Sequence, residues 1–129
     1  MTNIERIEKE LNTLLARINE DAFVIIEEVL TKKFVQFSGN KAMQLLLDLP
    51  SQTLNKKEIK RAETLFIEFG LPIETYPTYN RPGGKKVALQ RSFIMELGND
   101  TRKAALIAMR IFKEVYGFSD SFNLAIEEN

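Results

Sequence analysis

Hydrophobic residues near the start of the chain recur at the spacing of a helix. They lie three or four positions apart with charged residues between them, and the set is Ile4, Ile7, Leu11, Leu14 and Ile18. Apolar residues at this spacing form one stripe along a helix. We therefore expect a first helix of about four turns, ending before the polar residues at 19–21.

The pattern then changes to short apolar runs. β-Branched residues are frequent in 22–29, and Phe34–Phe37 follows after a polar turn. β-Branched and aromatic residues favour strands, so these runs predict two paired strands. Continuation of the first helix through residue 31 is the alternative for the same stretch. The aliphatic run 42–49, which stops at Pro50, predicts a third strand.

A second helix follows the third predicted strand. Asn55 can cap its start while Glu58, three residues later, reaches back as in a capping box, and Gly70 can end it. Beyond it, Ile73–Tyr79 and Lys86–Leu97 flank a Gly- and Pro-containing loop and predict two antiparallel strands.

A last helix is predicted between Asn99 or Asp100, either of which can cap it, and Gly117. Its apolar arc is wider than one contact surface needs. Such an arc indicates contact on two sides, either with the sheet and the carboxy-terminal tail or with the sheet and a second subunit.

Together these elements predict one α+β domain over residues 1–129. Its antiparallel five-stranded sheet and three helices follow the order helix, three strands, helix, two strands, helix. A chain of 129 residues with 44% hydrophobic residues suits one domain with one core. We found no internal repeat and no linker that would separate two domains.

Composition removes several function classes. The chain contains no His and no Cys, which excludes disulfides, Cys/His metal sites and His-based catalytic triads. No serine–lysine motif of useful spacing is present, and Asp48 and Glu96 are interpreted as exposed strand residues without a partner base. We therefore expect no enzyme activity, no catalytic residues, no cofactor and no metal.

The remaining chemistry is electrostatic. Basic and acidic residues balance at 18 each, and the excess of basic residues in 31–103 is scattered without interleaved aromatics, so we do not expect nucleic-acid binding. In the loop before the last strand, Arg81, Lys85 and Lys86 accompany two glycines and could contact an anion. A plain hairpin loop is the alternative.

Targeting signals were also considered. No apolar run approaches the length of a membrane span, and the charged stretch Met1–Glu10 does not suit a signal peptide. We therefore expect a cytoplasmic protein that does not bind membranes.

The element order, the Phe34–Phe37 strand and the Leu49-Pro50 exit into a capped helix ending in Gly70 suggest a known group. Over residues 3–117 the chain resembles the type III secretion chaperone-like group, which includes the YbjN family. The resemblance implies an α+β fold. It also implies a small homodimer that holds a segment of a partner protein without nucleotide or metal.

We therefore expect a non-enzymatic, chaperone-like protein-binding module. The candidate partner-binding residues are the apolar ones of the first helix, the last helix and the tail: Ile4, Ile7, Leu11, Phe112, Tyr116, Phe118 and Phe122. For the first helix, burial in the core is the alternative. Alternative functions are a small regulatory or structural adaptor that binds a folded partner, and a weak anion or nucleic-acid binder through the 80–86 loop.

Overall fold

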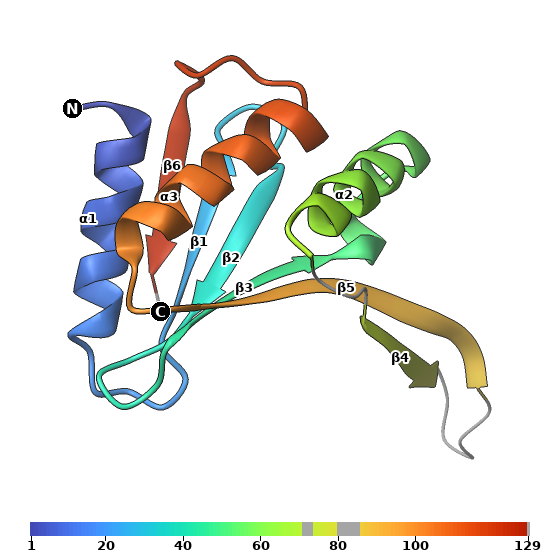
Figure 1. Ribbon diagram of the computed structural model, residues 1–129, viewed down its shortest axis with the longest axis horizontal. Helices are drawn as coiled ribbons and strands as arrows, with labels where there is room; N and C mark the ends of the chain where they lie inside the picture. The colour runs from blue at the N-terminus through green and yellow to red at the C-terminus, as the bar shows by residue number, and fades with distance from the viewer. Residues whose placement is uncertain (71–73, 80–85, 129) are drawn as a thin grey trace.

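Three helices pack on one face of a single antiparallel sheet (Figure 1). A computed structural model describes the backbone of residues 1–70, 74–79 and 86–128, and the side chains of 1–70 and 93–128. The helices are α1 (Asn3–Leu15), α2 (Lys56–Glu68) and α3 (Thr101–Arg110), and a 3₁₀ turn, η1 (Ser51–Thr53), precedes α2. The strands are β1 (Phe23–Glu28), β2 (Phe34–Ser38), β3 (Leu45–Pro50), β4 (Glu74–Tyr79), β5 (Lys86–Gly98) and β6 (Leu124–Glu128).

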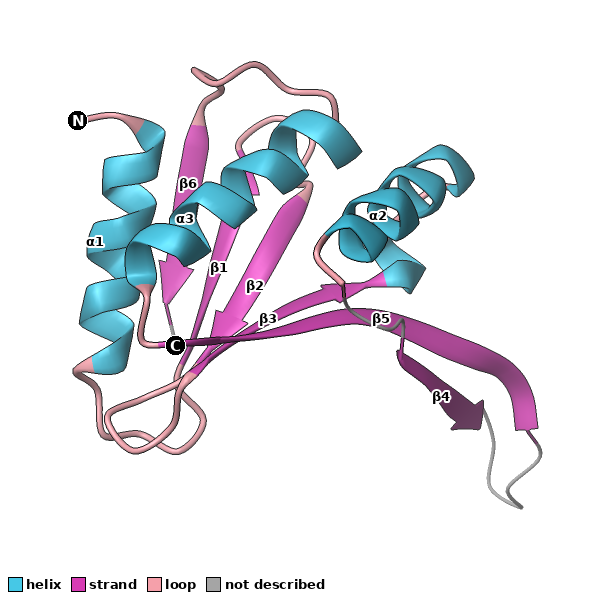
Figure 2. Ribbon diagram, viewed as in Figure 1, coloured by secondary structure: helices cyan, strands magenta, loops and turns pink. Residues whose placement is uncertain are grey.

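The strands lie in the order β4-β5-β3-β2-β1-β6, and each pairs antiparallel with its neighbours. The α+β fold, the three helices and the five predicted strands are confirmed in their predicted order (Figure 2). Residues 22–31 do not continue the first helix, because Phe23–Glu28 is extended and pairs with β2. The third strand starts later than predicted because Asn40 accepts hydrogen bonds from the backbone N–H groups of Ala42 and Met43 and holds a turn there.

Helix boundaries follow local hydrogen bonding. Asn55 and Glu58 form the predicted capping box of α2, and Asp100 caps α3 by accepting from the backbone N–H of Lys103. Beyond Arg110 the last helix continues as a π-helical turn, η2 (Ile111–Val115), so only its first ten residues are α-helical. Gly117, with φ 82°, supplies the left-handed residue that ends it.

The tail corrects the predicted five-stranded sheet, because it adds a sixth strand. Strand β6 pairs with β1 in the register Ile26↔Ile126, and Leu124 is buried. The tail also covers the last helix, since the rings of Phe112 and Phe122 lie 4.5 Å apart. The wide apolar arc of that helix is thus occupied by the sheet, by α1 and by the chain's own tail.

The hydrophobic core lies between the sheet and the helix layer. Its largest fully buried side chains come from β2, α2, β5 and η2, and they include Phe37, Phe66, Phe93 and Phe112. One ion pair crosses the layers, where Lys33 binds Glu58, whose side chain is almost fully buried. The described strands therefore form one sheet, and the core lies between that sheet and the three helices.

Candidate functional site

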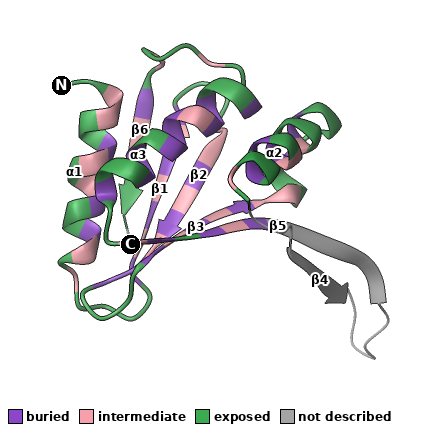
Figure 3. Ribbon diagram, viewed as in Figure 1, coloured by how far each residue is buried: buried purple, intermediate pink, exposed green. Residues whose placement is uncertain are grey.

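The face of the sheet opposite the helices is covered by no helix in the described part of the chain (Figure 2). Along β1, β2 and β3, buried residues that point toward the helices alternate with half-buried residues that point away (Figure 3). We call the surface formed by the second set the open face. Its large apolar residues are Phe23, Ile25, Phe34, Leu46 and Ile94.

The open face is more apolar than a solvent-facing side of an antiparallel sheet usually is. Such a sheet normally alternates apolar and polar residues, whereas strands covered on both faces have nearly continuous apolar sequences. Strands β1 and β3 are of the second kind, since 23–26 and 45–47 are unbroken apolar runs. Their sequences therefore suit strands that are covered on both sides, yet the described helices cover only one side.

The strand register makes these side chains neighbours. Ile25 lies opposite Gln36, Gln36 lies opposite Asp48, and Asp48 lies opposite Ile94. Adjacent strands are about 4.8 Å apart, so this row crosses four strands without a gap. The open face is therefore one continuous surface rather than a set of isolated residues.

Asp48, in the middle of that row, has an unusual environment. Its Oδ1 atom is buried and makes no hydrogen bond with any described residue. Burial raises the pKa of the Asp48 carboxyl above its ordinary value. A buried acceptor without a donor is costly, and because the side chain as a whole is only half-buried, a donor from outside the chain can reach its exposed part.

Asp48→Asn is expected to stabilise the isolated protein at pH 7, by less than about 1 kcal/mol because the side chain is half-buried and solvent screens its charge. An acid whose pKa is raised by folding contributes stability at low pH and loses it as the pH rises through the folded-state pKa. The gain from Asn should therefore vanish below about pH 4, near the ordinary pKa of aspartate. Urea unfolding of both proteins at pH 3.5 and pH 7 measures this, and a destabilised variant at pH 7 would contradict it.

The charges of the open face have one sign among its described side chains. Glu27, Asp48, Glu96 and Glu127 lie at its positions, and no Lys or Arg of the described side chains does. Lys32, in the turn after β1, contacts Glu27 at the rim with 3.6 Å between Nζ and Oε1. The open face is therefore an apolar surface with acidic groups in and around it.

The structure places four of the predicted partner-binding residues in the core. Ile7, Leu11 and Phe112 have no exposed surface and Tyr116 is 9% exposed. For these four residues the prediction of an accessible binding surface is wrong in the folded chain, because α1, η2 and the sheet bury one another. The Tyr116 hydroxyl donates to the Phe34 carbonyl at 2.6 Å, and burial raises the pKa of Tyr116. Its polar end is thus satisfied inside the chain.

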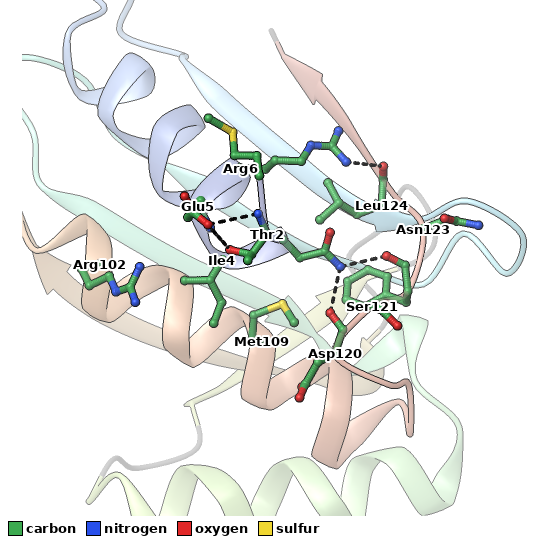
Figure 4. Close-up of a pocket in the computed structure, with 13 residues that line it drawn as sticks. Thr2, Ile4, Glu5, Arg6, Arg102, Met109, Asp120, Ser121, Asn123 and Leu124 are labelled. Carbon is green, nitrogen blue, oxygen red and sulfur yellow. Dashed lines mark hydrogen bonds between the residues drawn. The ribbon is translucent and has the colours of Figure 1, made fainter.

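Ile4 and Phe122 line a groove of about 760 Å³ at the start of α1 (Figure 4). Two polar side chains beside them, those of Asn3 and Arg6, are paired within the chain. Asn3 donates to the carbonyls of Asp120 and Phe122, and Arg6 donates to that of Leu124. Phe118 is half-buried against the core. The hydrogen bonds at the groove connect α1 to the tail. Partner binding by Ile4, Phe118 and Phe122 stays a prediction.

The predicted anion-contact residues lie outside the described side chains. Arg81 and Lys85 belong to the segment whose structure is not described, and Lys86 begins β5 with its side chain not described. Anion binding there stays a prediction.

Sequence reasoning did not recognise the open face, and it interpreted Asp48 as an exposed strand residue. Glu96 is exposed as interpreted, but Asp48 is half-buried. The signal that could have found the open face is the unbroken apolar sequence of β1 and β3. A strand with one side facing water normally alternates apolar and polar residues.

The described residues hold neither a cluster of metal ligands nor a helix that could span a membrane. No group of three or more His, Cys, Asp or Glu residues among them could hold a metal ion. None of the described helices is both long enough and apolar enough to span a membrane.

No protein-family model, curated protein or solved structure matches the chain. The resemblance to the secretion chaperone-like group therefore stays a prediction.

Proposed function

We propose that the protein is a non-enzymatic protein-binding module whose open face is covered by a partner protein. One observation carries this proposal: β1 and β3 have the apolar sequence of strands covered on both faces, and the helices cover only one. The apolar residues of the open face are half-buried in the folded chain, and contiguous apolar surface that still reaches solvent is typical of an interaction site. The unpaired buried oxygen of Asp48 lies within that same surface.

The proposal is tested by photo-crosslinking inside cells that express the protein. Benzoylphenylalanine replaces Phe23 on the open face in one variant and Ile67, which is 69% exposed on α2, in a matched control. We expect the Phe23 position to form a covalent adduct with another protein and the Ile67 position to form none. Equal adducts at both positions, or no adduct at Phe23, would contradict the proposal.

A second substitution separates binding from folding. Ile25→Thr keeps a β-branched side chain in β1 but removes apolar surface from the open face. In the Phe23 photo-crosslinking background it should reduce the adduct several-fold, while the circular dichroism spectrum remains that of the folded protein. Ile67→Thr in the same background should leave the adduct unchanged.

Homodimerisation, a chaperone-like role and a cytoplasmic location stay predictions. Light scattering of the purified protein measures the first of them.

A further inference from the structure

We propose that the occupant of the open face is an amphipathic helix of another protein whose apolar stripe is flanked by Arg or Lys, and that Asp48 accepts a hydrogen bond from one of these cations. The inference rests on the proposed function and specifies the chemistry of its partner. Three features of the open face carry it: the kind of surface it is, its size and its charge.

The first feature is that a sheet face offers side chains rather than backbone. The backbone groups of β1, β2 and β3 are used by strands on both sides, so an added strand has no ladder to join there. A sheet face is covered in proteins by helices or by a second sheet. Helices already cover the opposite face of this sheet (Figure 1).

The second feature is size. From β5 to β6 the described open face crosses five strands of five or six paired residues, which is about 20 Å by 20 Å at ordinary strand spacing and rise. Such an area, about 400 Å², is half of the 800 Å² that each partner of a standard protein–protein interface buries. A single helix of about 13 residues, about 20 Å long and 10 Å wide, therefore spans the face in one direction and covers about half of it.

The third feature is charge, and it argues against a second copy of this chain. Two copies packed through the open face would place Glu27, Asp48 and Glu96 of both copies in one interface, with no described Lys or Arg at the strand positions between them. Like charges brought together without water cost several kcal/mol. A partner with cations beside its apolar stripe meets the same surface favourably.

Asp48 indicates where one cation would lie. It lies in the row between Gln36 and Ile94 and is only half-buried, so the exposed part of its side chain can be reached from the open face although its Oδ1 is covered by the chain itself. An Arg or Lys side chain can lay its aliphatic part across the apolar residues of the open face and bring its charged end to the carboxylate. Charge-assisted hydrogen bonds of this kind are stronger than neutral ones.

Three synthetic peptides test the inference. Each has 14 residues, a fluorescent label and the same leucine stripe at helical spacing, and the residues flanking the stripe are Arg, Gln or Glu. Fluorescence anisotropy at physiological ionic strength gives the affinities for the full-length protein. We expect the Arg peptide to bind at least tenfold more tightly than the Gln peptide, and the Glu peptide to bind weakest.

Variants locate the contact. Asp48→Asn, which is expected to fold, should weaken binding of the Arg peptide about five- to tenfold and leave the Gln peptide unchanged. Glu20→Gln removes an exposed acid in the loop before β1 and serves as the matched control, with no effect on either peptide. Ile25→Thr should weaken both peptides.

Three results would overturn the inference. The first is equal binding of the Arg and Gln peptides, or no binding of any peptide. The second is an Asp48→Asn variant that binds the Arg peptide as well as the unchanged protein does. The third is a homodimer in light scattering that Ile25→Thr dissociates, which would assign the open face to a second copy. If any of these occurs while the Phe23 adduct with another protein still forms, the proposed function stands and only this partner chemistry fails.

Discussion

Phe112→Ala is expected to lower the free energy of unfolding by about 3–5 kcal/mol, the usual loss when a buried aromatic side chain is truncated. Phe112 has no exposed surface, and its ring lies 4.5–6.4 Å from those of Tyr116, Phe118 and Phe122. Its removal leaves a cavity beneath the tail. The neighbouring rings can fill that cavity only by giving up contacts that they make now. Urea unfolding followed by circular dichroism measures the loss.

The same substitution decides between the two roles that the sequence allowed for Phe112. A core residue changes stability, whereas a surface partner-binding residue changes binding and leaves stability nearly unaltered. Ile67→Ala is the control, because Ile67 is 69% exposed on α2, and its effect should stay within about 0.5 kcal/mol. A loss below about 1 kcal/mol for Phe112→Ala would contradict the burial described for the last helix.

The second large effect is expected from deletion of residues 124–129, which removes β6 (Leu124–Glu128). The deletion should also lower the free energy of unfolding by about 3–5 kcal/mol. Leu124 is buried and Ile126 packs against the core, and burying one such side chain contributes about 1.5–3 kcal/mol. The deletion also turns β1 into an edge strand, because β6 is its neighbour on that side. An unprotected apolar edge promotes aggregation, so the shortened protein should aggregate at lower concentration as well.

The double variant Leu124→Ala/Ile126→Ala separates the two contributions. It keeps the β6 backbone and removes most of its apolar surface. It should therefore show most of the loss in unfolding free energy that the deletion causes, without the same increase in aggregation. Thermal unfolding and light scattering of the two proteins give both quantities. A deletion that leaves the unfolding temperature unchanged would show that the tail is not part of the sheet.

Local signals in the sequence were sufficient for most of the fold. Asn55 and Glu58 predicted the start of α2 because a capping box depends on two residues three positions apart. Strand β1 was predictable from its β-branched residues, although the helix alternative had to be left to the structure. These features depend on residues that are close together in the sequence, and the structure confirms them.

Strand β6 was missed because its pairing is not local. Leu124–Glu128 contains three apolar residues followed by two glutamates, too short a pattern for a strand to be predicted from it. It is extended because β1, about a hundred positions earlier, offers it a free edge. The burial of Ile7 and Phe112 has the same origin, since a helical stripe does not specify whether the chain itself or another protein covers it.

The open face was missed for a different reason. In the sequence analysis, the apolar residues of β1 and β3 serve only as evidence that these segments are strands. The half-buried state of Asp48 depends on its neighbours across the sheet, Gln36 and Ile94, which are set by register. Register is a property of strand pairing and cannot be derived from the residues beside Asp48 in the sequence.

The central claim is that the side of the sheet away from the helices binds an amphipathic helix of another protein whose apolar stripe is flanked by Arg or Lys. Its most direct test is to follow the backbone amide signals of the ¹⁵N-labelled protein by NMR while the Arg peptide is added. The account predicts shifts concentrated in β1, β2, β3 and the end of β5, around Ile25, Gln36, Asp48 and Ile94, with α2 and α3 little changed. Shifts concentrated in the helices, or in the groove at the start of α1, would contradict it.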